Sequence, residues 1–254
     1  MTSPRVAVEW QPPGLASLRD AAALGRDAGT PVVTVALIAA NLAVWMLYEL
    51  PDLNGAIRDA SFYACDVENT CNSPQPWPIS WFTAMFLHAS WDHILGNLLF
   101  LAIFGKNVED AFGRLGFLVL YVAGGFAATV TQTVITLLVS PEADSRIPML
   151  GASGAVSAVL GAFLVLYPHS RIKTLVLVFI VRIPTWLYLG AWFLYQFLEA
   201  RYALLNPEEG GSGVAFAAHV GGFLFGVVAA WALISVGRIR AREAPQHRSA
   251  LSPS

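Results

Sequence analysis

Long apolar runs, separated by short polar stretches, fill the chain between residues 31 and 236. A helix needs about 20 mostly apolar residues to cross the hydrocarbon core of a bilayer. Six runs have about this length, so the pattern predicts six membrane-spanning helices. Their expected ranges are 31–50, 81–104, 116–139, 149–167, 183–200 and 214–236.

The remaining segments complete the predicted organisation. The apolar stretch 174–181 is too short to cross a bilayer, and Arg182 and Pro184 follow it, so we interpret it as an interfacial or re-entrant segment leading into the fifth helix. We expect residues 1–30 to form a cytoplasmic N-terminal segment and residues 31–236 a single membrane domain. Residues 237–254 are basic and then polar, which predicts a disordered cytoplasmic tail.

Composition supports a membrane protein. The chain is 56% apolar and 13% charged, whereas a typical soluble domain has about 25% charged residues. The expected surroundings are therefore a lipid bilayer. The net charge is −2 and the Lys and Arg residues form no basic stripe, so we expect no nucleic-acid partner.

The distribution of Lys and Arg predicts the orientation. Loops on the cytoplasmic side of a membrane carry an excess of these residues. If both termini are cytoplasmic, 12 of the 15 Lys and Arg residues lie inside, and only Arg58, Arg146 and Arg201 lie outside. We therefore expect cytoplasmic termini and an outer loop at 51–80.

This outer loop contains both cysteines of the chain, Cys65 and Cys71. An oxidising compartment would allow a disulfide between them, but their close spacing does not fix the geometry that a bridge requires. A disulfide and two free thiols therefore both remain open. The spacing of Cys and His residues does not indicate a zinc site, and we expect no metal.

Polar groups inside the predicted helices are costly and need an explanation. The second run contains His93 and Asn97, the fourth contains Ser153, and the sixth contains His219. Helix packing or hydrogen bonding between helices would explain any one of them. In the predicted topology, however, all four lie at a similar depth near the outer face. Four polar groups from three helices at one depth indicate a functional site.

These residue types suit acyl transfer. A serine hydroxyl needs a neighbouring base to become a nucleophile, and His219 can take the proton of Ser153 and later give it to the leaving amine. The side chains of His93 and Asn97, with the Ser153 backbone N–H, can stabilise the oxyanion. The fourth and sixth runs contain no acidic residue at a suitable depth, so we predict a Ser–His dyad rather than a triad.

Glycines flank the proposed catalytic residues. Gly151 and Gly154 allow the backbone and a substrate strand to approach each other closely. Gly221, Gly222 and Gly226 would let the sixth helix pack tightly on the fourth, because small residues permit close contact between helices. That packing would bring His219 to Ser153.

Four segments together resemble the rhomboid family of intramembrane serine proteases, in its six-helix prokaryotic form. They are HASWDHILGNLLFLAIFG (88–105), KNVEDAFG (106–113), GASGAVSAVLG (151–161) and AHVGGFLFG (218–226). The resemblance implies an all-α bundle of six transmembrane helices. It also implies a serine endopeptidase that cleaves single-span membrane proteins near the outer face, without a metal or other cofactor, in a bacterial plasma membrane.

The resemblance also implies roles for individual residues. Ser153 matches the nucleophile and His219 the general base, while His93 and Asn97 match the oxyanion residues. The matching motif and structural positions are Gly151, Gly154, His88, Glu109, Gly222 and Gly226. Glu109 matches an acidic residue in the turn after the second helix, where we expect it to accept hydrogen bonds.

The chain departs from the family pattern at two places. Ile79-Ser80 stands where many members have Trp-Arg, so we expect the outer loop to be held differently. Ser157 stands where some members have an aromatic ring that stacks on the catalytic histidine. Two alternatives follow: the ring of His219 is held less firmly, or another residue, such as Phe223, holds it.

Two other interpretations are considered. A non-catalytic rhomboid-like protein would bind membrane clients without cutting them, but such relatives typically lack the serine or the histidine, and this chain has both. A small transporter would use the intramembrane His and Asn residues as a polar path. Transporters often show internal repeats, and the sequence shows none.

Overall fold

A computed structural model describes residues 30–139, 142–176, 179–206 and 215–240. The predicted N-terminal segment up to residue 29 and the predicted tail beyond residue 240 lie outside the described residues. The elements in chain order are α2 (Val32–Val44), the π-helix η1 (Trp45–Glu49), α3 (Leu53–Ala60), the 3-10 helix η2 (Ala64–Asp66), α4 (Trp77–Ala84), α5 (Trp91–Val139), the 3-10 helix η3 (Glu142–Arg146), α6 (Ser153–Leu166), β1 (Arg171–Val176), β2 (Phe179–Pro184), α7 (Thr185–Leu205) and α8 (Phe216–Ser235).

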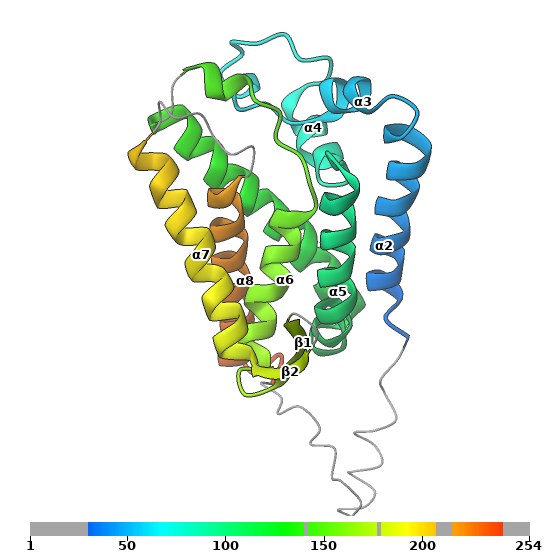
Figure 1. Ribbon diagram of the computed structural model, residues 1–254, viewed down its shortest axis with the longest axis vertical. Helices are drawn as coiled ribbons and strands as arrows, with labels where there is room; N and C mark the ends of the chain where they lie inside the picture. The colour runs from blue at the N-terminus through cyan, green and yellow to red at the C-terminus, as the bar shows by residue number, and fades with distance from the viewer. Residues whose placement is uncertain (1–29, 140–141, 177–178, 207–214, 241–254) are drawn as a thin grey trace, which may run out of the picture. The chain divides into compact units, whose positions relative to one another are not determined.

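Helix α5 contains both the second and the third predicted helices. Its 49 residues would extend about 74 Å as a straight helix at 1.5 Å per residue. The chain instead turns back at Gly113, whose backbone angles are φ 72° and ψ 163°. Glycine adopts a positive φ readily because it has no Cβ. Two limbs result, 91–112 and 114–139, and the second runs back along the bundle (Figure 1).

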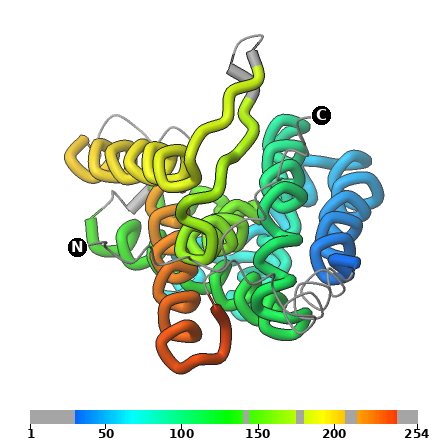
Figure 2. Tube along the Cα trace, turned by 90° about the horizontal axis from the view of Figure 1, so that it is seen from below, coloured from blue at the N-terminus to red at the C-terminus, as the bar shows by residue number. Residues whose placement is uncertain are grey.

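Helix α6 lies at the centre of the bundle, packed against both α5 and α8 (Figure 2). All its side chains from 154 to 163 are buried, as expected for a helix that is apolar on every side. The contact with α8 is made backbone to backbone. A methyl group added to Gly226 would lie 1.9 Å from the carbonyl oxygen of Ala158, so only glycine permits this approach.

The second predicted helix begins ten residues later than expected. Residues 81–84 belong to the short helix α4, and α5 begins only at Trp91. Between them the chain turns, as shown by the hydrogen bonds from Met85 N to Phe82 O and from Phe86 N to Thr83 O. Ser90 starts the new helix, because its hydroxyl oxygen accepts a hydrogen bond from His93 N at 3.2 Å. Hydropathy misses this break because the turn itself is apolar.

The stretch 174–181 belongs to an antiparallel β-hairpin, not to a re-entrant segment. Strands β1 and β2 pair from Arg171 with Pro184 to Val176 with Phe179. The hairpin extends sideways beyond the helices (Figure 2) and leads directly into α7. Several of its residues, such as Ile172 and Ile183, are β-branched, which favours extended backbone.

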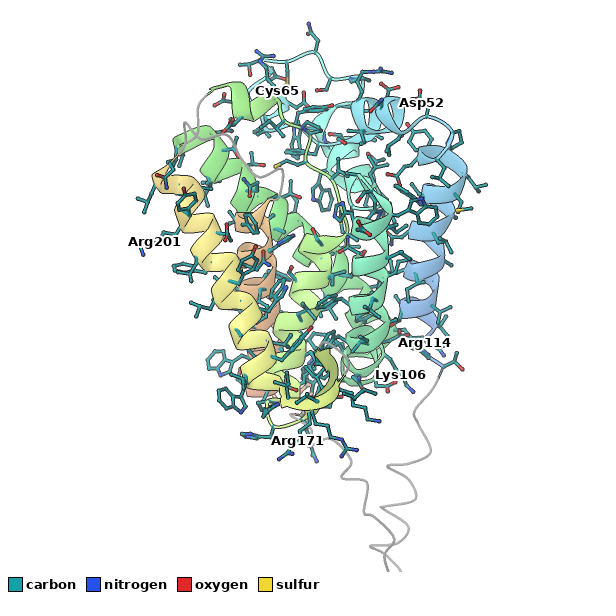
Figure 3. All side chains as sticks on the ribbon, viewed as in Figure 1. Asp52, Cys65, Lys106, Arg114, Arg171 and Arg201 are labelled. Carbon is teal, nitrogen blue, oxygen red and sulfur yellow. A yellow bond between two sulfur atoms is a disulfide. The ribbon has the colours of Figure 1, made fainter. Side chains whose placement is uncertain are left out.

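The two ends of the bundle differ in charge. Lys106, Arg114 and Arg171 gather at one end, whereas Asp52 and Cys65 lie at the other (Figure 3). Among the described residues, three helices are long and apolar enough to cross a membrane, namely Val32–Glu49, Trp91–Val139 and Phe216–Ser235, and Ser153–Leu166 is a shorter apolar helix.

Glu109, near the end of the first limb of α5, links that limb to the start of α2. Its buried carboxylate accepts hydrogen bonds from Val33 N (3.0 Å), Thr34 N (2.8 Å) and the Thr34 hydroxyl (2.7 Å). Helix α2 has no side-chain cap of its own, so Glu109 satisfies two of its free N–H groups. This is the acceptor function expected for Glu109.

The segment 51–80 carries α3, η2 and the start of α4 at the opposite end of the bundle. Cys65 and Cys71 form a disulfide in this segment, with Cα atoms 5.6 Å apart. The structure therefore has the bridge, rather than two free thiols.

Candidate active site

Helices α5, α6 and α8 begin at the same end of the bundle, close to the segment that contains Asp52 and Cys65 (Figure 1, Figure 3). His93 lies in the first turn of α5, Ser153 is the first residue of α6, and His219 lies in the first turn of α8. The fold therefore brings these three residues to one end of the bundle.

The connection before Ser153 is held by backbone hydrogen bonds. Met149 and Phe62 exchange two of them, at 2.7 and 3.0 Å, and Gly151 N donates to Ala84 O at 2.8 Å. Gly151 has φ 121°, which side chains with a Cβ rarely adopt. The nucleophile motif is thus fixed against the outer segment on one side and starts α6 on the other.

His93 packs directly on this glycine. A methyl group at Gly151 would lie 2.8 Å from His93 Nε2 and 3.5 Å from the Ser153 hydroxyl, so the imidazole and the hydroxyl both flank Gly151. His93 Nδ1 accepts a hydrogen bond from Ala89 N at 3.3 Å. The neutral ring therefore carries its proton on Nε2, on the side of Gly151, where it can be donated.

Asn97 lies one helical turn after His93 and is 7% exposed. Its amide nitrogen Nδ2 is buried and has no hydrogen-bond partner among the described residues. A buried donor without a partner is unfavourable, unless a ligand supplies the acceptor. Asn97 and His93 therefore provide two donors on one face of α5.

His219 is positioned by the contact between α6 and α8. A methyl group at Gly222, three residues after His219, would lie 2.2 Å from the carbonyl oxygen of Gly154. Residues three apart share one helix face, so His219 lies on the side of α8 that meets the start of α6.

The ring of His219 is held mainly from α7. Its Nδ1 forms a 2.7 Å hydrogen bond with Gln196 Oε1. The Trp192 ring lies 6.2 Å away, tilted by 35°, and Phe216 meets the imidazole edge-on at 6.5 Å. Because an amide oxygen can only accept, His219 carries its proton on Nδ1 and leaves Nε2 free to accept one.

The imidazole is thus held by other residues, as one of the two alternatives has it, and among the described residues its ring neighbours are Trp192 and Phe216 rather than Phe223. Phe223 packs its ring on Trp192 and Phe193 instead, at centroid distances of 5.9 and 4.8 Å. Ser157, at the position that is aromatic in some relatives, donates its hydroxyl proton to Ser153 O at 2.6 Å. It therefore bonds to the backbone of the nucleophile's own turn.

The glycines of α8 face two different helices. Gly222 and Gly226 meet α6, and Gly154 of α6 meets Ala128 in the second limb of α5. Gly221, expected on the same contact, faces Thr131 of α5 instead, where an added methyl would lie 2.2 Å from the hydroxyl oxygen. Adjacent helical residues point about 100° apart, so Gly221 and Gly222 cannot share a partner.

His88 supports the site from the connection before α5. It is fully buried, and its ring packs edge-on against His93 with centroids 5.0 Å apart. Its backbone N–H donates to the carboxylate of Glu49, a buried residue at the end of η1. Burial, with a smaller contribution from the charge of His93, lowers the pKa of His88 to about 3.

A group of potential metal ligands lies elsewhere. Among the described residues it consists of Cys65, Asp66 and Cys71. The two sulfurs are joined in the disulfide, and a disulfide sulfur is not the thiolate that binds metals. The proposed chemistry near Ser153 uses none of these residues.

Three supporting residues were not identified from the sequence: Glu49, Trp192 and Gln196. Glu49 and Gln196 are polar residues inside apolar runs, which is the signal that marked His93 and Asn97. No motif indicated a role for them, because Trp192 and Gln196 lie on α7 and Glu49 lies in η1, outside the rhomboid-like segments.

Comparison with known proteins identifies the family. The Rhomboid domain matches residues 74–236, which is well over half of the chain. The chain therefore belongs to the rhomboid family and is a mostly helical, multi-pass membrane protein. The match includes every residue of the candidate site from His88 to His219.

Several curated relatives are similar at modest identity. RHOMBOID-like protein 12, mitochondrial, of Arabidopsis thaliana is 33% identical over 168 residues, covering 62% of this chain and 47% of that protein. Rhomboid protein 1, mitochondrial, of Saccharomyces cerevisiae is 30% identical over 196 residues, covering 77% and 51%. The chain thus spans about half the length of the curated relatives it matches. Their organellar names do not support the predicted bacterial plasma membrane or a specifically prokaryotic type.

Proposed function

We propose that this protein is an intramembrane serine endopeptidase with Ser153 as nucleophile and His219 as general base. The observation that carries the proposal is a pair of complementary imidazoles: His93 flanks Gly151 together with the Ser153 hydroxyl, and His219 lies on the side of α8 that meets the start of α6. His219 has a free acceptor nitrogen, so it can take a proton. His93 has an N–H donor, so it can bind an oxyanion.

In the proposed reaction, His219 Nε2 takes the proton of the Ser153 hydroxyl as the oxygen attacks the scissile carbonyl. The new oxyanion is met by His93 Nε2–H, by the unpaired Asn97 amide and by the Ser153 backbone N–H, which lies in the first turn of α6 and has no acceptor within the helix. The imidazolium then protonates the leaving amine, and water hydrolyses the acyl-enzyme through the same base.

The short central helix supports a site within the membrane. Helix α6 has 14 residues, or about 21 Å at 1.5 Å per residue. The hydrocarbon core is about 30 Å thick. If the far end of α6 lies at the basic surface, then Ser153 lies below the opposite surface, deep enough to need water drawn in from outside.

The topology proposed has six spans: α2 with η1, the two limbs of α5, and α6, α7 and α8. The clustering of Lys106, Arg114 and Arg171 at the far end favours a cytoplasmic or equivalent location for that end. The candidate site then faces the opposite compartment. Single-span membrane proteins, cut near that surface, are the proposed substrates.

The direct test is cleavage of a single-span substrate by the purified chain in detergent. We expect Ser153→Ala and His219→Ala to abolish cleavage. Ser235→Ala and His169→Ala are matched controls, because both residues are exposed and lie outside the candidate site, so we expect wild-type rates.

The results also test the non-catalytic alternative. If wild type binds membrane clients but cuts none of a panel of single-span substrates, the protein is a rhomboid-like binding protein. If Ser153→Ala or His219→Ala still cuts at the wild-type rate, the assignment of the dyad is wrong.

A further inference from the structure

We propose that Gln196 of α7 is a positioning residue for His219 and takes the place of the third member of a catalytic triad. The inference rests on the proposed function, because it gives Gln196 a role only if His219 is the base. Gln196 lies outside the Ser–His pair and belongs to a helix that contributes no reacting group.

The geometry singles out this side chain. Among the described residues of α7, only Thr185, Leu189 and Gln196 are buried, and Gln196 is 6% exposed. The neighbouring residues Tyr195 and Phe197 are exposed. An amide that is buried on an otherwise lipid-facing stretch is costly, and here its oxygen lies 2.7 Å from His219 Nδ1.

This bond sets which nitrogen of His219 carries the proton. Gln196 Oε1 accepts the proton of Nδ1, so the lone pair lies on Nε2, the nitrogen that acts as the base in the proposed reaction. The opposite tautomer would put the proton on Nε2, which could then not accept the proton of Ser153. In serine proteases with a triad, a buried carboxylate gives the histidine this tautomer and orientation.

A neutral amide suits a site in the membrane better than a carboxylate. An ionised group that is buried among apolar helices must be paired or it is strongly destabilising. Gln196 accepts the same hydrogen bond without adding a charge. When His219 becomes an imidazolium, the bond becomes charge-assisted and stronger, so Gln196 also stabilises the charge that develops during the reaction.

The hydrogen bond between Gln196 and His219 also limits how far α7 can move. A displacement of α7 by more than about 0.5 Å at the level of Gln196 lengthens a 2.7 Å contact beyond the usual range of hydrogen-bond distances, unless the side chain follows. Any movement of α7 that admits a substrate must therefore leave this level in place, or reverse before the chemical step.

The test compares Gln196→Met with Gln196→Glu in the full-length chain. Methionine keeps a similar volume but has no carbonyl oxygen, so we expect kcat to fall about 10- to 100-fold with little change in KM. Glutamate restores an acceptor at the same place, so we expect it to recover most of the activity. Its carboxylate favours the imidazolium, which moves the acid limb of the pH profile of kcat/KM to higher pH.

Leu189→Ala is the matched control for the packing of α7. Leu189 is fully buried on the same helix, two turns earlier, and is not part of the proposed site. We expect this variant to lower the thermal midpoint without a change in the shape of the pH profile. A Gln196 variant that behaves in the same way as Leu189→Ala would overturn the inference.

A second readout does not depend on activity. The ¹⁵N chemical shifts of selectively labelled histidines report which ring nitrogen carries the proton. We expect His219 to be protonated at Nδ1 in wild type and to lose this preference in Gln196→Met. If Ser153→Ala abolishes cleavage but Gln196→Met keeps both wild-type kcat and the Nδ1 tautomer, the inference fails and the proposed function stands. If Ser153→Ala cleaves normally, the proposed function fails first.

Discussion

The contact between α6 and α8 predicts that a single added methyl group will damage both stability and activity. The substitution is Gly226→Ala. The new Cβ would lie 1.9 Å from Ala158 O, whereas ordinary contact begins at 3.4 Å. The helices must therefore separate by about 3.4 − 1.9 = 1.5 Å at this point, because the obstacle is backbone and cannot rotate away.

The size of the effect follows from that displacement. Overpacking of this kind costs up to about 3 kcal/mol, and alanine returns about 1 kcal/mol through its higher helix propensity. We therefore expect a net loss of about 2 kcal/mol. His219 lies on the same helix two turns away, so the shift also moves the base. A misplacement of about 1 Å can cost 100-fold in rate.

Thermal unfolding in detergent and cleavage of a single-span substrate measure the two effects. Gly190→Ala is the matched control, because an added Cβ on Gly190 of α7 meets nothing within 4 Å. We expect it to keep full activity and an equal or slightly higher midpoint. A Gly226→Ala variant with the midpoint and rate of wild type would refute the close contact of α8 with α6.

Three further perturbations test the surrounding fold. Glu109→Gln replaces one of the two carboxylate oxygens that cap α2, so we expect thermal unfolding to show a loss of about 2 kcal/mol of stability. The control Asp110→Asn should have little effect. Equal midpoints for the two variants would contradict the cap. Removing the disulfide with Cys65→Ser and Cys71→Ser should cost about 2 kcal/mol and leave the spectrum of the helical bundle unchanged; an unchanged midpoint would mean that the bridge is absent. His88 has a pKa of about 3 in the folded state and about 6.5 in the unfolded state, so the unfolded state binds the proton first as the pH falls. Stability should therefore fall by about 2 kcal/mol between pH 7 and pH 5. A thermal midpoint that is equally sensitive to pH in His88→Asn would contradict this assignment.

The order of the polar groups in the sequence was enough to predict the candidate site. Ser153, His219 and His93 each stand in an apolar run that cannot tolerate them without a reason, and the predicted alternating topology would place all three runs with the same end outward. The partners of these groups were harder to predict. Gln196 bonds His219 from a helix whose face toward the site is defined only by packing, and no local pattern reveals it.

The boundaries that failed have physical causes. Hydropathy could not separate α4 from α5, because residues 85–87 are as apolar as the helices on either side, and only the Ser90 cap marks the new start. The hairpin after α6 was missed because a short apolar stretch fits a strand and an interfacial helix equally well. Gly221 was predicted to contact α6 but contacts α5. Two adjacent glycines in a sequence do not show which neighbouring helix each of them faces.

The central claim is that Ser153 is a nucleophile activated by His219. Incubation with a fluorophosphonate, followed by peptide mapping by mass spectrometry, tests it most directly. We predict a single covalent adduct on the peptide that contains Ser153, at a rate that falls at least 100-fold in His219→Ala. An adduct on another serine, or equal labelling of Ser153 in the His219→Ala variant, would contradict the claim.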